Sequence, residues 1–187
     1  MKERLGRYLL LFLLVNSCLL LKAQYVQIDG IARDTSFTVN SALIKERKKR
    51  PHLEAVKPDL PDNVKVCEGV VYSNPYAGRS LKMNIYRPDD DKKYLVLIML
   101  HGGGGASGNL SLQVPLAQQI AARGYVTIPV QYRLMPEALY PASAPELQNA
   151  VTWVRANSDK LSMDTVFRAV SVCWVVGLLA MLAGMSK

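Results

Sequence analysis

The sequence predicts an α/β fold over residues 64–187, in which a mostly parallel sheet is flanked by helices and preceded by a β-hairpin. The apolar run 94–100 has the length and composition of a strand that is buried on both faces of a parallel sheet. After it, stretches of helix and strand character alternate, as in right-handed βαβ units. A histidine and four glycines, residues 101–105, follow the run directly, where open α/β sheets carry their sites.

A hairpin is predicted before the buried strand. Residues 64–72 and 81–86 are rich in β-branched and aromatic side chains, and apolar and polar residues alternate along them. The segment between them, residues 74–78, contains asparagine, proline and glycine, which favour turns. We therefore expect two antiparallel strands at one edge of the sheet.

Residues 110–123 are predicted to form the first crossover helix. Their apolar side chains recur at helical spacing, and Gly124 stands where a helix commonly ends. Proline is favoured in the first turn of a helix, so the regular part is expected to begin close to Pro115.

A second strand and a second helix are predicted next. Residues 125–132 read as a strand, although Pro129 is anomalous for a central strand because proline lacks an N–H donor. Residues 145–157 place their apolar side chains on one helical face, and Pro145 suits the first helical position.

The first 24 residues are predicted to be a secretory signal peptide. Lys2, Arg4 and Arg7 precede the apolar run 8–21, and small or polar residues follow it. The run is short for a membrane span, so we expect cleavage near residue 23 or 24 and a secreted or periplasmic protein. A lipid anchor through Cys18 is the alternative.

The basic charge of the chain does not indicate a nucleic-acid partner. The formal net charge is +8, and the leader accounts for three of these charges, from four bases and one acid. Most of the rest lies at residues 45–50, within a predicted arm or linker, 25–63, which several prolines interrupt. No aromatic residues interleave with this basic run to stack on bases, so a solvated segment is expected.

The remaining cysteines do not predict a metal site. Cys67 and Cys173 are expected to be small apolar core residues, although an oxidising compartment would allow them to pair. Neither lies at the spacing of a metal site, and no cofactor is predicted.

The glycine run suits the stabilisation of an oxyanion. Successive backbone N–H groups in such a loop can converge on the negative charge that develops on an attacked carbonyl oxygen. Each donor can stabilise the transition state by about 3 to 4 kcal/mol. Glycine is needed because a Cβ would obstruct close approach and disfavour positive φ values. The alternative, a flexible linker, is disfavoured because the run follows a buried strand at once.

Four segments in order resemble the α/β-hydrolase superfamily, specifically the hormone-sensitive-lipase-like esterases and their bacterial carbohydrate-esterase relatives. They are residues 101–105, 122–126, 132–137 with 140–142, and 150–157.

The resemblance implies the N-terminal half of that fold and hydrolysis of a small carboxylic or carbohydrate ester by a serine nucleophile. It also implies that the N–H groups of Gly103 and Gly104 are the oxyanion donors, and that His101, Gly102 and Gly105 shape the loop. Two departures occur: Gln131 replaces an aspartate, and an aromatic residue is missing at 105–106.

The nucleophile that the resemblance implies is missing. A Gly-x-Ser-x-Gly turn should follow the next strand, but alignment of the helix after it places Trp174 at the serine position. Ser171 and Ser107 lack the flanking glycines, and Cys173 lacks a base. The predicted site therefore has no identifiable catalytic nucleophile.

The acid and the histidine of a triad are missing too. The two histidines, His52 and His101, precede the elbow position, whereas the family order is serine, acid, histidine. A frame error is one explanation, because a one-base shift of the codons for residues 172–174 can read Ser-Ala-Gly. Truncation and a true pseudoenzyme are the others, and the underlying nucleotides distinguish them.

Two further interpretations stay open. A partial hydrolase scaffold could serve as a noncatalytic secreted binding protein. Residues 169–185 carry no charge over 17 residues and could anchor a fragment in a membrane, although a buried strand, turn and helix is favoured there. The oligomeric state and the particular substrate do not follow from the sequence.

Overall fold

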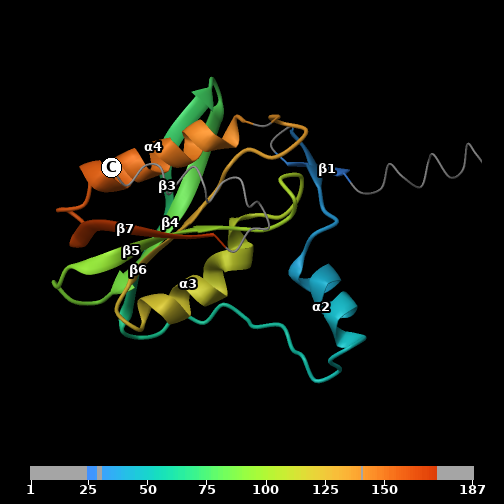
Figure 1. Ribbon diagram of the computed structural model, residues 1–187, viewed down its shortest axis with the longest axis horizontal. Coiled ribbons are helices and arrows are strands. Elements are labelled where there is room, and N and C mark those ends of the chain that lie inside the picture. The colour runs from blue at the N-terminus through green and yellow to red at the C-terminus, as the bar shows by residue number, and fades with distance from the viewer. Residues whose placement is uncertain (1–24, 29–30, 140, 172–187) are drawn as a thin grey trace, which may run out of the picture.

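The computed structural model describes residues 25–28, 31–139 and 141–171 (Figure 1). Its main body is a five-stranded mixed sheet with the strand order β3-β4-β6-β5-β7. The strands are β3 (Val64–Tyr76), β4 (Arg79–Pro88), β5 (Tyr94–Leu100), β6 (Val126–Val130) and β7 (Met163–Ser171). The predicted signal peptide, residues 1–24, lies outside the part described.

The predicted hairpin is confirmed. β3 pairs antiparallel with β4, and the turn contains Gly78 at a φ of +79°. β3 stands at one end of the strand order, and only Val64 and Tyr72 along it are buried. Cys67 is exposed there, so the expectation of a core cysteine is wrong at this position. Cys173 lies outside the described residues.

The parallel part of the sheet is centred on β5, as the apolar run predicted. β5 lies between β6 and β7 and runs parallel to both, and its residues 96–100 are buried. Leu100 lies opposite Val130 on one side and opposite Ser171 on the other. The chain therefore leaves these three strands at one edge of the sheet, next to residues 101–105.

Pro129 lies in a central strand, against the sequence rule, and the ladder accommodates it. β4 and β6 pair antiparallel at Met83–Val130 and at Tyr86–Thr127. The residues between these two positions are not paired across β4 and β6. Continuing this register would place Pro129 opposite Asn84. The missing N–H therefore falls in the gap, while parallel pairing with β5 continues through Met99.

Two crossover helices cover opposite faces of the sheet (Figure 1). The first begins as a 3₁₀ turn, η2 (Leu110–Gln113), and continues as α3 (Val114–Ala121), with Pro115 in its first turn as predicted. Ala117 and Ala121 of α3 pack with Met99.

The second crossover helix is α4 (Ser143–Ala156), which starts two residues earlier than predicted. Pro145 is therefore its third residue, still in the first turn, where proline removes no intrahelical hydrogen bond. Leu147, Ala150 and Val154 pack into the larger core cluster on the other sheet face.

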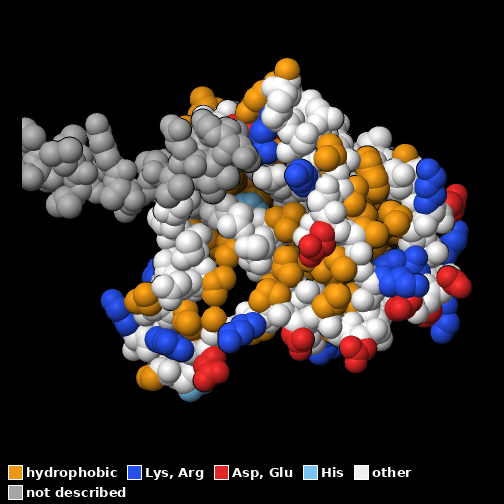
Figure 2. All heavy atoms as spheres, turned by 180° about the vertical axis from the view of Figure 1, so that it is seen from behind, with side chains coloured by type: hydrophobic (Ala, Val, Ile, Leu, Met, Phe, Trp, Pro, Cys, Tyr) orange, Lys and Arg blue, Asp and Glu red, His pale blue; other side chains and the backbone are white. Residues whose placement is uncertain are grey.

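The arm is more regular than its prolines predicted. It contains an antiparallel pair, β1 (Tyr25–Ile28) and β2 (Ile31–Asp34), and a helix, α2 (Val39–Arg47). The prolines at 51, 58 and 61 all follow α2, whose start is fixed by reciprocal hydrogen bonds between Thr38 and Ser41. No residue of α2 is buried, so the helix adds little to the core, and Figure 2 shows lysine and arginine side chains at the surface of this part of the chain, at the lower left.

The third interpretation of the sequence concerned a membrane segment at 169–185. The last three residues of β7 belong to it, and the rest falls outside the described residues. Among the residues that the structure does describe, no helix has the length and apolar character needed to span a bilayer.

Candidate functional site

The glycine loop begins at a buried histidine. His101 follows β5 directly and is 1% exposed, with its Nδ1 2.8 Å from the carbonyl oxygen of Gly102. The ring of Tyr132 stacks on the imidazole at a centroid distance of 4.6 Å. The Tyr132 hydroxyl also donates to the backbone carbonyl of His101 at 2.7 Å. His101 is thus packed inside the protein at the start of the loop, where its role in shaping the loop stays a prediction.

The glycines are required by the backbone. Gly103, Gly104 and Gly105 have φ values of +127°, +65° and +76°, which side chains disfavour. A Cβ on Gly103 would also lie 2.0 Å from the carbonyl oxygen of Ser107. A Cβ on Gly104 would meet nothing within 4 Å, so that side of the loop is open.

Hydrogen bonds within the loop use its carbonyl groups. The Gly103 carbonyl accepts from the N–H groups of Ala106 and Ser107, at 3.2 and 3.1 Å, and from the Ser107 hydroxyl at 3.1 Å. The Gly105 carbonyl accepts from the N–H of Met135 at 2.8 Å. Within the described residues, the N–H groups of Gly103 and Gly104 donate to no backbone or side-chain acceptor.

The other predicted site residues are placed only in part. Ser107 is buried, and its hydroxyl is engaged by the loop, which agrees with its poor match to a nucleophile. His52 is exposed in the arm. Ser171 is the last residue of β7 and lies opposite Leu100, so its backbone is beside the loop. Cys173 and Trp174 lie beyond the part of the chain that is described.

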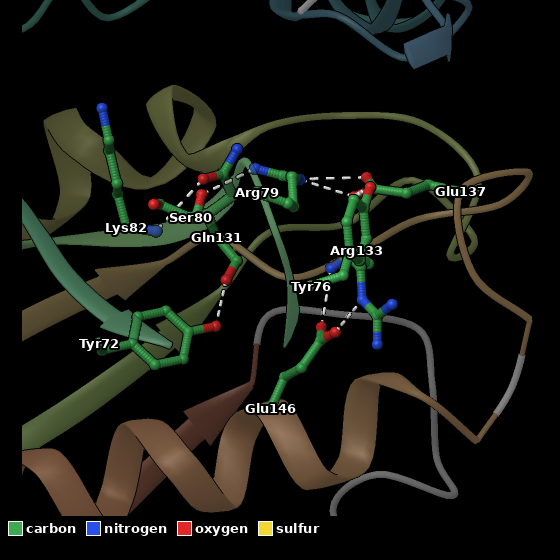
Figure 3. A network of polar contacts seen from close by, with 9 residues as sticks. All are labelled: Tyr72, Tyr76, Arg79, Ser80, Lys82, Gln131, Arg133, Glu137 and Glu146. Atoms are coloured by element: carbon green, nitrogen blue, oxygen red, sulfur yellow. Dashed lines mark hydrogen bonds and ion pairs between the residues drawn. The ribbon is translucent and has the colours of Figure 1, made fainter. Parts of the chain in front are cut away.

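A network of buried ion pairs joins β4 and α4 to the segment after β6, and no sequence pattern predicted it (Figure 3). Arg79 of β4 donates to both carboxylate oxygens of Glu137, at 2.6 and 3.3 Å, and the side chains are 9% and 3% exposed. The Tyr76 hydroxyl donates to the same carboxylate at 3.1 Å. Burial lowers the pKa of Arg79, but the hydrogen bond and charge of Glu137 outweigh it and raise the pKa.

A second pair ties the segment after β6 to α4. Glu146 accepts from the backbone N–H of Arg133 at 2.9 Å and from its guanidinium Nε, and its side chain is 3% exposed. Arg133 and Glu137 both belong to the 132–137 segment that carried the family resemblance. Their partners lie 13 and 58 residues away in sequence, so no local pattern could identify them.

Gln131, which departs from the expected aspartate, has a structural role. Its side-chain oxygen accepts from the N–H of Lys82 at 3.3 Å, and its carbonyl accepts from the hydroxyl of Tyr72. Burial raises the pKa of Tyr72 well above its usual value. Within the described part of the chain, no three histidine, cysteine, aspartate or glutamate side chains are grouped to hold a metal ion.

Residues 83–187 match the family model described as BD-FAE. Esterase LipC of Mycobacterium tuberculosis is 33% identical over 107 residues, which cover 56% of this chain and 27% of LipC. Ethyl acetate hydrolase of Pseudomonas putida is 31% identical over 168 residues, which cover 84% of this chain and 52% of the hydrolase.

Solved structures of esterases have a similar fold. Esterase B from Lactobacillus rhamnosis superimposes with a TM-score of 0.54 at 18% identity, over 71% of this chain and 42% of the esterase. A structure from work on two Rhizomucor miehei esterases gives a TM-score of 0.52 at 27% identity, over 73% and 42%. The chain thus spans about half or less of the proteins that it matches.

Proposed function

Because this chain belongs to the BD-FAE family of α/β-hydrolase esterases, we propose that its glycine loop is the oxyanion-binding half of a carboxylic-ester hydrolase site. The observation that carries the proposal is that, among the described residues, the Gly103 and Gly104 N–H groups donate to no acceptor, on a loop at the carboxyl end of β5. In an intact site, such donors stabilise the oxyanion that forms when a serine attacks the ester carbonyl.

The second part of the proposal is that the 187-residue chain does not itself hydrolyse esters. Ser107 has its hydroxyl bonded to the Gly103 carbonyl, and Ser171 lacks the flanking glycines of a nucleophile turn. His101 is packed against Tyr132, and His52 is exposed in the arm. We therefore propose that neither serine is activated by a general base in this chain.

The ligand class follows from the loop and the family. Two neutral N–H donors favour a small group with one strongly accepting oxygen, such as the carbonyl of a carboxylic ester. The name of the Pseudomonas putida relative, ethyl acetate hydrolase, supports a short acyl group for this chain as well. A carbohydrate ester fits the same chemistry.

Two measurements on the full chain test the proposal. Release of nitrophenol from p-nitrophenyl acetate is expected at the buffer rate, and turnover above it would refute the inactivity. In a nitrogen-15 spectrum, sodium methylphosphonate is expected to shift the amide resonances of Gly103 and Gly104. Gly124, which lies against Tyr94 at the end of β5 opposite the loop, is the internal control and should not move. Absence of any loop shift would refute the oxyanion site.

A further inference from the structure

The glycine loop is held at both ends by one short segment of the chain. At its start, the His101 carbonyl accepts from the Tyr132 hydroxyl at 2.7 Å. At its end, the Gly105 carbonyl accepts from the Met135 N–H at 2.8 Å. Gly103 and Gly104 lie between these two points. The segment 132–135 therefore bridges the loop across the residues that carry the available donors.

Tyr132 makes two contacts with His101 at the start of the loop. Its ring lies nearly parallel to the His101 imidazole, at an interplanar angle of 19°, and its hydroxyl reaches the carbonyl of the same residue. Tyr132 is 6% exposed, so the hydrogen bond is shielded from competing water. A shift of this ring would move the imidazole and the first peptide of the loop together.

The bridging segment is itself anchored to the rest of the fold. Arg133 bonds to Glu146 through both its N–H and its guanidinium, which attaches the segment to α4. Leu134 is buried in the core, 3% exposed. Beyond the segment, the Glu137 carboxylate is fixed by Arg79 of β4. The segment that holds the loop is thus attached to α4 through Glu146, and the residue that follows it closely, Glu137, is attached to β4 (Figure 3).

From these contacts we infer that Tyr132 and Glu146 are positioning residues for the oxyanion donors. Tyr132 sets the start of the loop directly, and Glu146 acts through Arg133 on the segment that holds both ends. The inference rests on the proposed function, because it assigns these residues to the donors of that site. Neither residue is expected to touch the ester.

Amide hydrogen exchange on the full chain tests the inference. The N–H groups of Ala106, Ser107 and Met135 are bonded within or to the loop, so their protection reports its geometry. Tyr132→Phe keeps the ring and removes the hydroxyl. Loss of one buried neutral hydrogen bond is expected to lower these three protection factors about threefold to tenfold. Ile98, in the middle of β5, should keep its protection relative to wild type.

The matched control is Tyr94→Phe. It removes a tyrosine hydroxyl from the opposite end of β5, where that hydroxyl donates to Asp90 at 2.8 Å. The loop amides should not respond to it. If Tyr132→Phe fails to fold, Glu146→Gln provides the test, with the same pattern expected because it removes the charge that holds Arg133.

The outcomes separate this inference from the proposed function. Equal loss of protection at Ile98 and at the loop amides would mean a general stabilising role and would overturn the inference. Unchanged loop protection would overturn it as well, even if methylphosphonate still shifts the Gly103 and Gly104 resonances. If the loop amides alone respond while methylphosphonate shifts nothing, the positioning of the loop stands and the oxyanion site fails.

Discussion

Two alanine substitutions in the glycine loop should differ greatly in cost. Gly103→Ala and Gly104→Ala both place a side chain at positive φ, which costs about 1 to 2 kcal/mol. Only the first also creates a clash, because the new Cβ would lie 2.0 Å from the Ser107 carbonyl oxygen. To reach a van der Waals contact of 3.4 Å, that backbone must move by about 1.4 Å.

Such a movement breaks the bonds that close the loop. The Gly103 carbonyl accepts three hydrogen bonds from Ala106 and Ser107, each worth about 1 kcal/mol when satisfied. Gly103→Ala is therefore expected to lower the free energy of unfolding by about 3 to 5 kcal/mol. Gly104→Ala should lower it by about 1 to 2 kcal/mol, because its new Cβ meets no atom within 4 Å.

Urea unfolding followed by circular dichroism measures both values. The two variants should unfold with the slope of the wild type and differ only in midpoint, which makes the free energies comparable. Equal destabilisation by the two substitutions, within about 0.5 kcal/mol, would contradict the described packing of Gly103 against Ser107.

Three other predictions concern a buried ion pair, a buried tyrosine and a helix cap. Glu137→Gln leaves a buried guanidinium without its counter-charge and should cost about 3 kcal/mol in urea unfolding, whereas Asp159→Asn, in an exposed pair, should have no measurable effect. Tyr72→Phe should make the free energy of unfolding fall less steeply with pH above about pH 10. Burial raises the folded-state pKa above the unfolded value of 10.0, so the native tyrosine keeps its proton while the unfolded one loses it. If the free energy of unfolding of the variant falls with pH as steeply as that of the wild type, the raised pKa of Tyr72 is contradicted. Thr38→Ala should speed amide exchange in α2 without moving the global midpoint, since α2 buries no residue, and a shifted midpoint would contradict this.

Patterns that are local in sequence predicted most of the sheet and the glycine loop. The run at 94–100 is apolar because β5 is covered on both faces, and the alternation at 81–86 matches a strand with one buried face. The glycines at 103–105 were informative because positive φ is a backbone demand that few other residues meet. These properties belong to single residues or to their near neighbours.

Other features depend on contacts between distant segments, and the sequence could not reveal them. Cys67 is exposed because β3 is an edge strand with few buried residues, and the composition of β3 does not indicate this position. The ion pair of Arg133 with Glu146 could be predicted only by someone who knew where α4 packs. For α2 a local signal is present in Thr38 and Ser41, which cap the helix, and the prolines of the arm do not oppose it because they all follow the helix.

The most direct test of the central claim is the mass of the intact chain after treatment with an alkyl fluorophosphonate, which phosphonylates activated serines. An active esterase treated in parallel is the positive control. Oxyanion donors without a nucleophile predict no adduct on the 187-residue chain, because the Ser107 hydroxyl is engaged by the loop and Ser171 lacks a nucleophile turn. A single phosphonyl adduct on either serine would contradict the account.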